Sequence, residues 1–187
     1  MEGPDHEELF ERGEFHHDQF LRLGNLDDIE KAIEYGNRAL DLTPSQHPRM
    51  PIQLTCLGAY YDDLFRRLEN LEDMEKSIEC HVRALGLTPD DHPQLSFRLG
   101  NLGISHGVRF RCLGQLDDLQ KSIDYKSRAL ALTPDGHPDL PNWHGALGVS
   151  YADRYRCLGE LGDLEKWVES DSLALTLTPD DHPDLPE

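Results

Sequence analysis

The chain has 187 residues, of which 37% are hydrophobic and 29% are charged, a composition typical of a folded globular protein. Its 36 Asp and Glu residues against 18 Lys and Arg give a net charge of −18 at pH 7, which argues against nucleic acids and anionic membranes as partners. No apolar run approaches the roughly 20 residues of a membrane-spanning helix, and the N-terminus lacks the features of a signal peptide, so we expect a cytoplasmic protein.

One phrase recurs along the whole chain: Leu-Thr-Pro, a pair of small or polar residues, then His-Pro. It starts at Leu42, Leu87, Leu132 and Leu177, so it returns every 45 residues. A fixed period of about 20–50 residues indicates a stacked repeat array. We therefore expect one repeat domain over residues 1–187. Its predicted repeats are about 4–48, 49–93, 94–138 and 139–183, with 184–187 beginning a truncated further repeat.

Each repeat is predicted to begin with a long helix. In the second repeat, Leu57, Tyr61, Phe65 and Leu68 fall at i, i+4, i+8 and i+11, which places them on one helix face between Met50 and Leu68. The row recurs in the third and fourth repeats and decays in the first. The three further rows are Leu102, His106, Phe110, Leu113; Leu147, Tyr151, Tyr155, Leu158; and Arg12, His16, Phe20, Leu23. A degenerate first helix is expected at the end of an array, where one face meets water.

A short break and a second helix follow in each repeat. The breaks and the acidic residues that open the second helices lie at equivalent positions: Gly24-Asn25, Glu69-Asn70, Gly114-Gln115 and Gly159-Glu160; then Asp27-Asp28, Glu72-Asp73, Asp117-Asp118 and Asp163. Because carboxylates in a first turn complement the helix dipole, we favour that role over a metal or acid–base site. The Thr-Pro of the recurring phrase then ends each second helix.

The repeat resembles the tetratricopeptide repeat. In the second repeat the resemblance is carried by Leu57-Gly58-x-x-Tyr61, Ser77-Ile78, Ala84-Leu85 and the closing Pro89. Leu147-Gly148-x-x-Tyr151 matches the same motif, whereas Leu102-Gly103-x-x-His106 departs at the aromatic residue. The family period is about 34 residues, so these repeats are elongated. The resemblance implies an all-α fold, a right-handed superhelical solenoid of antiparallel helix pairs with about four repeats.

The elongated form is similar to the repeats of kinesin light chains. It is still more similar to fungal arrays that accompany CHAT protease-like or nucleotide-binding domains. The resemblance covers essentially the whole chain and implies a non-catalytic scaffold that binds a protein or peptide. The alternative it leaves open is a regulatory or sensor arm of a larger protein that carries one of those domains.

The histidines and cysteines do not form a recognisable catalytic or metal-binding motif. The turn histidines His47, His92, His137 and His182 lie one repeat apart, roughly 10 Å between neighbours in a stack, which is too far to share one ion. We expect them to cap turns or accept a bond from the next helix start. The cysteines, which we expect to be free and buried or half-buried, are Cys56, Cys80, Cys112 and Cys157. We expect no catalytic residue, metal or cofactor.

In the resembled family, the first helices of successive repeats line a concave groove that holds the partner. Carried over by position, the groove would be lined by three sets: Thr55, Ala59, Asp62, Asp63 and Arg66; Gly100, Ile104, Gly107, Val108 and Arg111; and Gly145, Val149, Ala152, Asp153 and Arg156. We hypothesise that the row Arg66, Arg111 and Arg156 engages an acidic group of the partner, since guanidinium suits carboxylate. The alternative is that these arginines pair with neighbouring acids of the chain.

The fourth repeat departs from the pattern at Trp167, which replaces the small residues Ala32, Ser77 and Ser122. Either this repeat packs differently or Trp167 turns to an open end. An uncapped end would leave apolar surface of the last helix exposed, so we also expect self-association through the C-terminal end.

Overall fold

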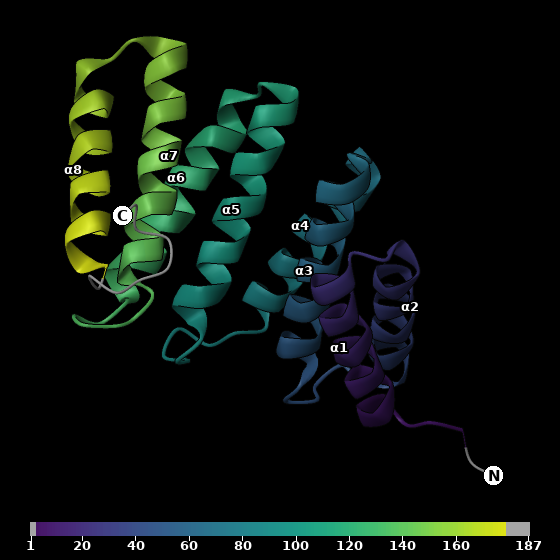
Figure 1. Cartoon of the computed structure of the whole chain (residues 1–187). Coiled ribbons are helices and arrows are strands. Elements are labelled where there is room, and N and C mark those ends of the chain that lie inside the picture. Colours follow the sequence, from purple (N-terminus) through teal and green to yellow (C-terminus); the bar gives the residue numbers. More distant parts are fainter. Residues whose placement is uncertain (1–2, 179–187) are drawn as a thin grey trace. The chain divides into compact units, whose positions relative to one another are not determined.

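A computed structural model describes residues 3–178 of the chain, and all the regular structure among these residues is helical. Figure 1 shows the helices in chain order. They are α1 (His6–Leu23), α2 (Leu26–Leu42), α3 (Met50–Leu68), α4 (Leu71–Gly86), α5 (Leu95–Leu113), α6 (Leu116–Leu132), α7 (Leu140–Leu158) and α8 (Leu161–Leu177). The predicted all-α helical-repeat class is confirmed. His182 and the further repeat predicted at 184–187 lie outside the described residues.

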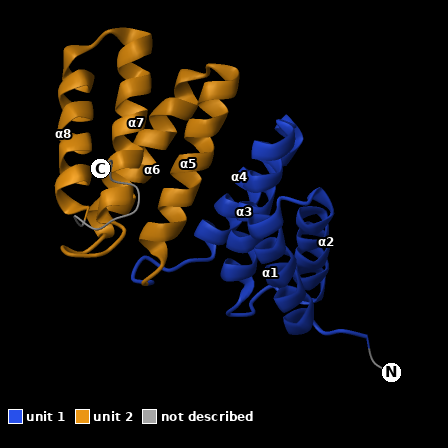
Figure 2. Cartoon of the chain, viewed as in Figure 1, with its two compact units in different colours: residues 1–92 blue, residues 93–187 orange. Residues whose placement is uncertain are grey.

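The helices pair as four hairpins and form two compact units, residues 1–92 and 93–187 (Figure 2). In the first unit α1 pairs with α2 and α3 with α4, while α3 also packs on α2 and touches α1. The second unit repeats this plan, with α5 paired to α6, α7 paired to α8, and α7 packed on α6 and touching α5. Each unit therefore contains one complete junction between successive repeats.

The break inside each hairpin is a left-handed C-cap. Gly24, Gly114 and Gly159 take φ of 69°, 68° and 70°, and the N–H of each bonds to the carbonyl oxygen four residues earlier. Glycine adopts this conformation without steric cost, which explains its use there. In the second repeat Glu69 takes the same conformation with φ of 56°, the one described non-glycine residue with positive φ. The predicted breaks are confirmed.

A glycine on each first helix lets the paired helices approach closely. A Cβ on Gly58 would lie 2.6 Å from the His81 ring, and one on Gly103 would lie 3.2 Å from the Lys126 backbone nitrogen. The facing small residues of the second helices, Ser77 and Ser122, are fully buried. The glycine of the repeat motif thus leaves room for a side chain of the second helix at Gly58 and for the backbone of that helix at Gly103.

In the first, third and fourth hairpins an acid of the second-helix start also joins the two helices, whereas Asp73 of the second hairpin pairs only with Lys76 of its own helix. Arg154 on α7 donates to both carboxylate oxygens of Asp163 on α8, at 2.9 and 2.6 Å, and this pairing holds the Asp163 pKa below its usual value. In the first hairpin His16 Nδ1 lies 3.0 Å from an oxygen of Asp28. The helix-dipole role expected from the sequence therefore accounts for only part of what these acids do.

Two sequence expectations about histidine and cysteine have different outcomes. His47 and His137 each accept a bond at Nδ1, 3.2 Å from the backbone nitrogens of Arg49 and Asp139 just before the next helix. The expected role of accepting a bond from the next helix start is confirmed for these two histidines.

The burial expected of the cysteines holds for Cys56 and Cys80 but is wrong for Cys112 and Cys157, which are exposed. These two lie in the solvent-facing last turn of a first helix, where the earlier repeats carry arginine.

Candidate functional site

The residues carried over from the groove of the resembled family lie on α3 in the first unit and on α5 and α7 in the second. Not all of them reach the surface. Thr55 is buried and donates to the Pro51 carbonyl oxygen at 2.8 Å. Gly100 is buried because the Trp143 ring covers it; a Cβ there would lie 2.1 Å from that ring. Gly107 and Ala152 are buried as well, and the uncharged members that are half-buried or exposed are Ala59, Ile104, Val108, Gly145 and Val149.

The two acids of the second repeat are both engaged within the first unit. Asp63 lies 2.7 Å from His17 Nε2 of α1 and accepts a 2.6 Å bond from Arg66. Asp62 accepts a 2.6 Å bond from Ser77 and lies 3.3 Å from His81 Nε2, both on α4. These carboxylates therefore connect α3 to α1 and α4.

The arginine row divides into two paired members and one unpaired member. Arg66 bonds to Asp63 at 2.6 Å, and Arg156 bonds to Asp153 at 2.9 Å, in each case across three residues of one helix. Arg111 has Val108 at that position, and within residues 3–178 no carboxylate lies within ion-pair distance of it. The alternative expected from the sequence, pairing with a neighbouring acid of the chain, therefore holds for Arg66 and Arg156 but not for Arg111.

A second cation without a carboxylate partner lies close to Arg111. Lys126 on α6 is only 4% exposed, and its Nζ donates to the Ala146 carbonyl at 3.1 Å and to Ser150 Oγ at 2.7 Å, both on α7. Burial, aided by the positive charge of Arg111 and opposed by a smaller effect of Asp153, lowers the Lys126 pKa to about 8. This ammonium group has polar partners but no neutralising charge within 4 Å among the described residues.

Sequence reasoning missed Lys126 because it compared only the small and apolar residues of the second helices. The 45-residue period aligns this lysine with three chemically different residues, Gly36, His81 and Asp171. A search for charged residues at that inward-facing position would have found it. The neighbouring Arg111 was among the predicted groove residues.

Trp167 lies beside α7 and not free at an open end. Its Nε1 donates to Asp171 at 2.6 Å, and the Arg156 guanidinium lies over the indole ring, 5.5 Å from its centre. Asp171 in turn lies under Gly148, where a Cβ would come within 2.4 Å of its oxygen. The fourth repeat accommodates the indole at the edge of its hairpin.

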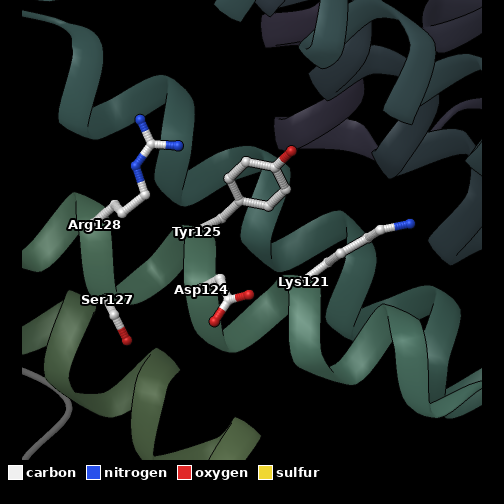
Figure 3. A pocket seen from close by; sticks show the side chains of 5 residues that line it. All are labelled: Lys121, Asp124, Tyr125, Ser127 and Arg128. Atoms are coloured by element: carbon white, nitrogen blue, oxygen red, sulfur yellow. The ribbon is translucent and has the colours of Figure 1, made fainter.

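An open pocket of approximately 570 Å³ lies along α6. Figure 3 shows its lining side chains, with the Tyr125 ring between Arg128 and Lys121. Tyr125 also stacks on His106, with ring centres 5.7 Å apart.

In the described part of the chain, no three His, Cys, Asp or Glu side chains gather closely enough to hold a metal ion. None of the helices within residues 3–178 combines the length and the apolar character needed to cross a membrane.

Comparison with known proteins places the fold. No protein-family model and no curated protein matches the sequence. Among solved structures, nearly identical TPR-like repeats from Podosopora anserina, named for a kinesin light chain, align with 98% of this chain and 82% of their own, at a TM-score of 0.68 and 13% identity. The chain has the tetratricopeptide-repeat fold.

Two further solved structures align with most of the chain. BtubC (BKLC) from P. vanneervenii aligns with all of this chain and 72% of its own length, at a TM-score of 0.67 and 16% identity. The thermophilic TPR protein TTC0263 of Thermus thermophilus aligns with 95% of this chain and 76% of its own, at a TM-score of 0.62 and 21% identity. The tetratricopeptide resemblance inferred from Leu57-Gly58-x-x-Tyr61 is therefore confirmed as a fold.

Proposed function

We propose that this TPR-fold chain is a protein-interaction scaffold, and that its partner is a protein or peptide bound along the exposed faces of the first helices. The proposal includes no catalytic step and no cofactor. It is supported by the fold, which presents the first helices of successive repeats next to one another within each unit. It is also supported by the chemistry of α5 and α7.

The observation that carries the proposal is Arg111. Arg111 is the one arginine of the predicted groove row without an acidic neighbour in the described region, although Arg22, Arg67 and Arg128 elsewhere on the surface are also unpaired there. Its equivalents Arg66 and Arg156 have one, at 2.6 and 2.9 Å. Arg111 is exposed on α5 and unpaired in the described region, so it can bond a partner's carboxylate without first breaking an internal ion pair.

Peptides selected from a random display library on the immobilised protein would test the function. We expect the selected peptides to be enriched in Asp or Glu and to bind the Arg111→Glu variant roughly tenfold or more weakly, since a charge-assisted hydrogen bond contributes about 1.5–3 kcal/mol. Arg66→Glu is the matched control, because that arginine already has an internal partner, and it should weaken binding less. Failure to select any specific peptide, or equal binding to both arginine variants, would contradict the proposal.

Another copy of the chain is a second proposed partner, which would bind through α8.

A further inference from the structure

The first helix of each repeat has a position for an acid and, three residues later, a position for an arginine. In chain order the residues at these two positions are Asp18 and Leu21, Asp63 and Arg66, Val108 and Arg111, and Asp153 and Arg156. The second and fourth repeats form the ion pair, at 2.6 and 2.9 Å. The third repeat keeps only the arginine, whereas the first keeps only the acid. Asp18 of α1 is therefore the counterpart of Arg111, an exposed charge whose partner on the same helix is missing.

Asp18 belongs to a row of acids that no cation neutralises. Glu11, Glu14 and Asp18 fall at i, i+3 and i+7 of α1, so they lie on one side of the helix, and all three are exposed. Their carboxylates form no ion pair or hydrogen bond with residues 3–178. In the three later repeats the position of Glu14 carries an uncharged residue, so this row distinguishes α1 from the other first helices.

Glu14 shows that the row is unfavourable in the free protein. Burial and the negative charges of Asp18 and Glu11 raise the pKa of its carboxyl, against a smaller opposing effect of Arg49 just before α3. Acids three or four residues apart on a helix repel each other. A cation bound to Glu14 and Asp18 would relieve that repulsion.

A buried hydroxyl of α3 faces the same acids. Tyr60 is 2% exposed, and its ring packs against His17 of α1, with ring centres 4.5 Å apart. Burial raises the pKa of Tyr60, so this phenol stays neutral, and the negative charges of Glu14 and Asp18 also act on it. Its hydroxyl has no hydrogen-bond partner among the described residues. The side of α1 that turns to α3 therefore has two exposed carboxylates and one unused hydroxyl, and the oxygen atoms of all three can accept a bond from an N–H donor.

We propose that Glu14 and Asp18 bind a Lys or Arg side chain of the partner on the face of α1 that turns to α3. The inference rests on the proposed function and identifies the chemistry that the partner presents to the first unit. Lys and Arg have several N–H donors on one head group, which can bond both exposed carboxylates from solvent while its charge offsets their repulsion. His17 lies between the two acids but is engaged elsewhere, since its Nε2 lies 2.7 Å from Asp63.

The first test uses the amide of N-acetyl-lysine as the probe and follows the Glu carboxyl carbons by NMR. We expect the probe to shift the Glu14 resonance saturably and to lower the Glu14 pKa, because a bound cation favours the charged carboxylate. Glu30, an exposed acid of α2, is the control. The inference is overturned if Glu14 responds no earlier than Glu30, or if sodium chloride has the same effect as the probe.

A Leu21→Arg variant supplies the missing cation from within the helix. Leu21 is 61% exposed, so the fold should tolerate the change. We expect the new arginine to pair with Asp18 as Arg66 pairs with Asp63, and to weaken the response to the probe roughly threefold. Leu21→Gln, which adds no charge, should respond as wild type does. Equal responses from the two variants would show that the missing arginine does not create the site.

The second test uses peptides selected by display on the immobilised protein. We expect one class of them to be rich in Lys or Arg, and the double variant Glu14→Gln, Asp18→Asn to weaken the binding of this class roughly tenfold or more. Glu30→Gln should leave that binding unchanged, and a peptide with Gln in place of its basic residues should bind wild type and the double variant alike.

The outcomes of the selection separate this inference from the proposed function. A selection that yields only acidic peptides, or equal binding of basic peptides to wild type and the double variant, would overturn the inference and leave the proposed function standing. A saturable Glu14 response to the lysine probe with no selectable peptide would contradict the proposed function alone.

Discussion

Lys126 is a destabilising residue in the free protein. An ammonium group that is 4% exposed has lost most of its hydration, and its two polar acceptors carry no full charge. Its pKa of about 8, well below the ordinary value of 10.5, expresses that cost. We expect Lys126→Met to stabilise the protein at neutral pH by about 1–2 kcal/mol, since methionine fills a similar volume and leaves only Ser150 and one carbonyl with altered bonding.

The destabilisation caused by Lys126 should depend on pH. Below pH 8 the lysine is charged in both the folded and the unfolded protein, so the full cost of burying the charged amine is present. Between about pH 8 and 10.5 the unfolded chain binds more protons at this residue than the folded one, so the stability of wild type rises relative to that of the variant. Urea unfolding of both proteins at pH 7 and pH 10 measures the gap. A gap that stays constant or widens with pH would contradict the assignment, and Lys121→Met should show no such trend.

At the scale of the helical hairpin, one buried carboxylate holds α5 to α6. Asp118 is 1% exposed and accepts bonds from Arg109 Nε at 3.0 Å and from the His106 ring at 2.9 Å. Burial acts to raise its pKa, but the bonds from Arg109 and His106 outweigh burial and hold the pKa below the ordinary value. We expect Asp118→Asn to cost about 3 kcal/mol in unfolding free energy, because it leaves Arg109 without its buried counter-charge.

The neighbouring acid provides a matched control for this prediction. Asp117 lies in the same first turn, has a 78% exposed side chain and pairs with Lys121 at 2.6 Å, so Asp117→Asn should cost no more than about 0.5 kcal/mol. The Asp118 contribution should be complete above the carboxyl's unfolded pKa and disappear as pH falls through its lower folded pKa. Thermal unfolding between pH 7 and pH 3 would test this; similar losses for the two variants at pH 7 would show that dipole effects dominate.

The elements of this fold could be predicted from sequence because their determinants are local. Apolar rows at i, i+4 and i+8, left-handed glycines such as Gly114, and the Thr-Pro stops depend on a few adjacent residues, and the period repeats them four times. Glu69 shows the strength of that local signal, since it takes the glycine conformation at the equivalent break.

The candidate site was only partly predictable because its chemistry depends on pairs of residues on different helices. Arg111 could be placed on the first-helix face by alignment, but its lack of a partner depends on Val108. The burial of Lys126 depends on α7, which packs over it with Ala146 and Ser150. Conversely Gly100, placed in the groove by alignment, lies under Trp143. Side-chain packing between repeats decided each of these cases.

At the scale of the whole molecule, the two units share one plan of helices but not one chemistry. At the repeat junction of the first unit, Gly36 faces the Tyr60 ring and His17 lies 2.7 Å from Asp63. Burial raises the pKa of Tyr60, so this phenol stays neutral. The equivalent junction of the second unit carries Lys126 and Ser150 in place of that glycine and tyrosine. The second unit therefore has an amine at the junction where the first unit has a glycine and a neutral phenol.

The outer side of α8 is expected to determine whether copies of the whole molecule associate. In α2 and α6, Ile33, Leu40 and Leu130 are partly buried in clusters shared with the next hairpin. Their α8 equivalents Val168 and Leu175 are 58% and 63% exposed. Because those positions bury apolar surface wherever another hairpin follows, we expect α8 to associate with a second copy of the chain.

Sedimentation velocity over a wide concentration range measures this association. We expect wild type to show a concentration-dependent shift toward larger species, and the double variant Val168→Glu, Leu175→Glu to remain monomeric, because two added carboxylates per copy would be desolvated and would repel each other in an already acidic chain. Leu132→Glu, at a 47% exposed position at the end of α6, is the control for added charge alone and should associate as wild type does. If wild type is monomeric at the highest concentration, the exposed apolar side chains of α8 do not drive association. Val168 and Leu175 would then serve only the packing of their own hairpin.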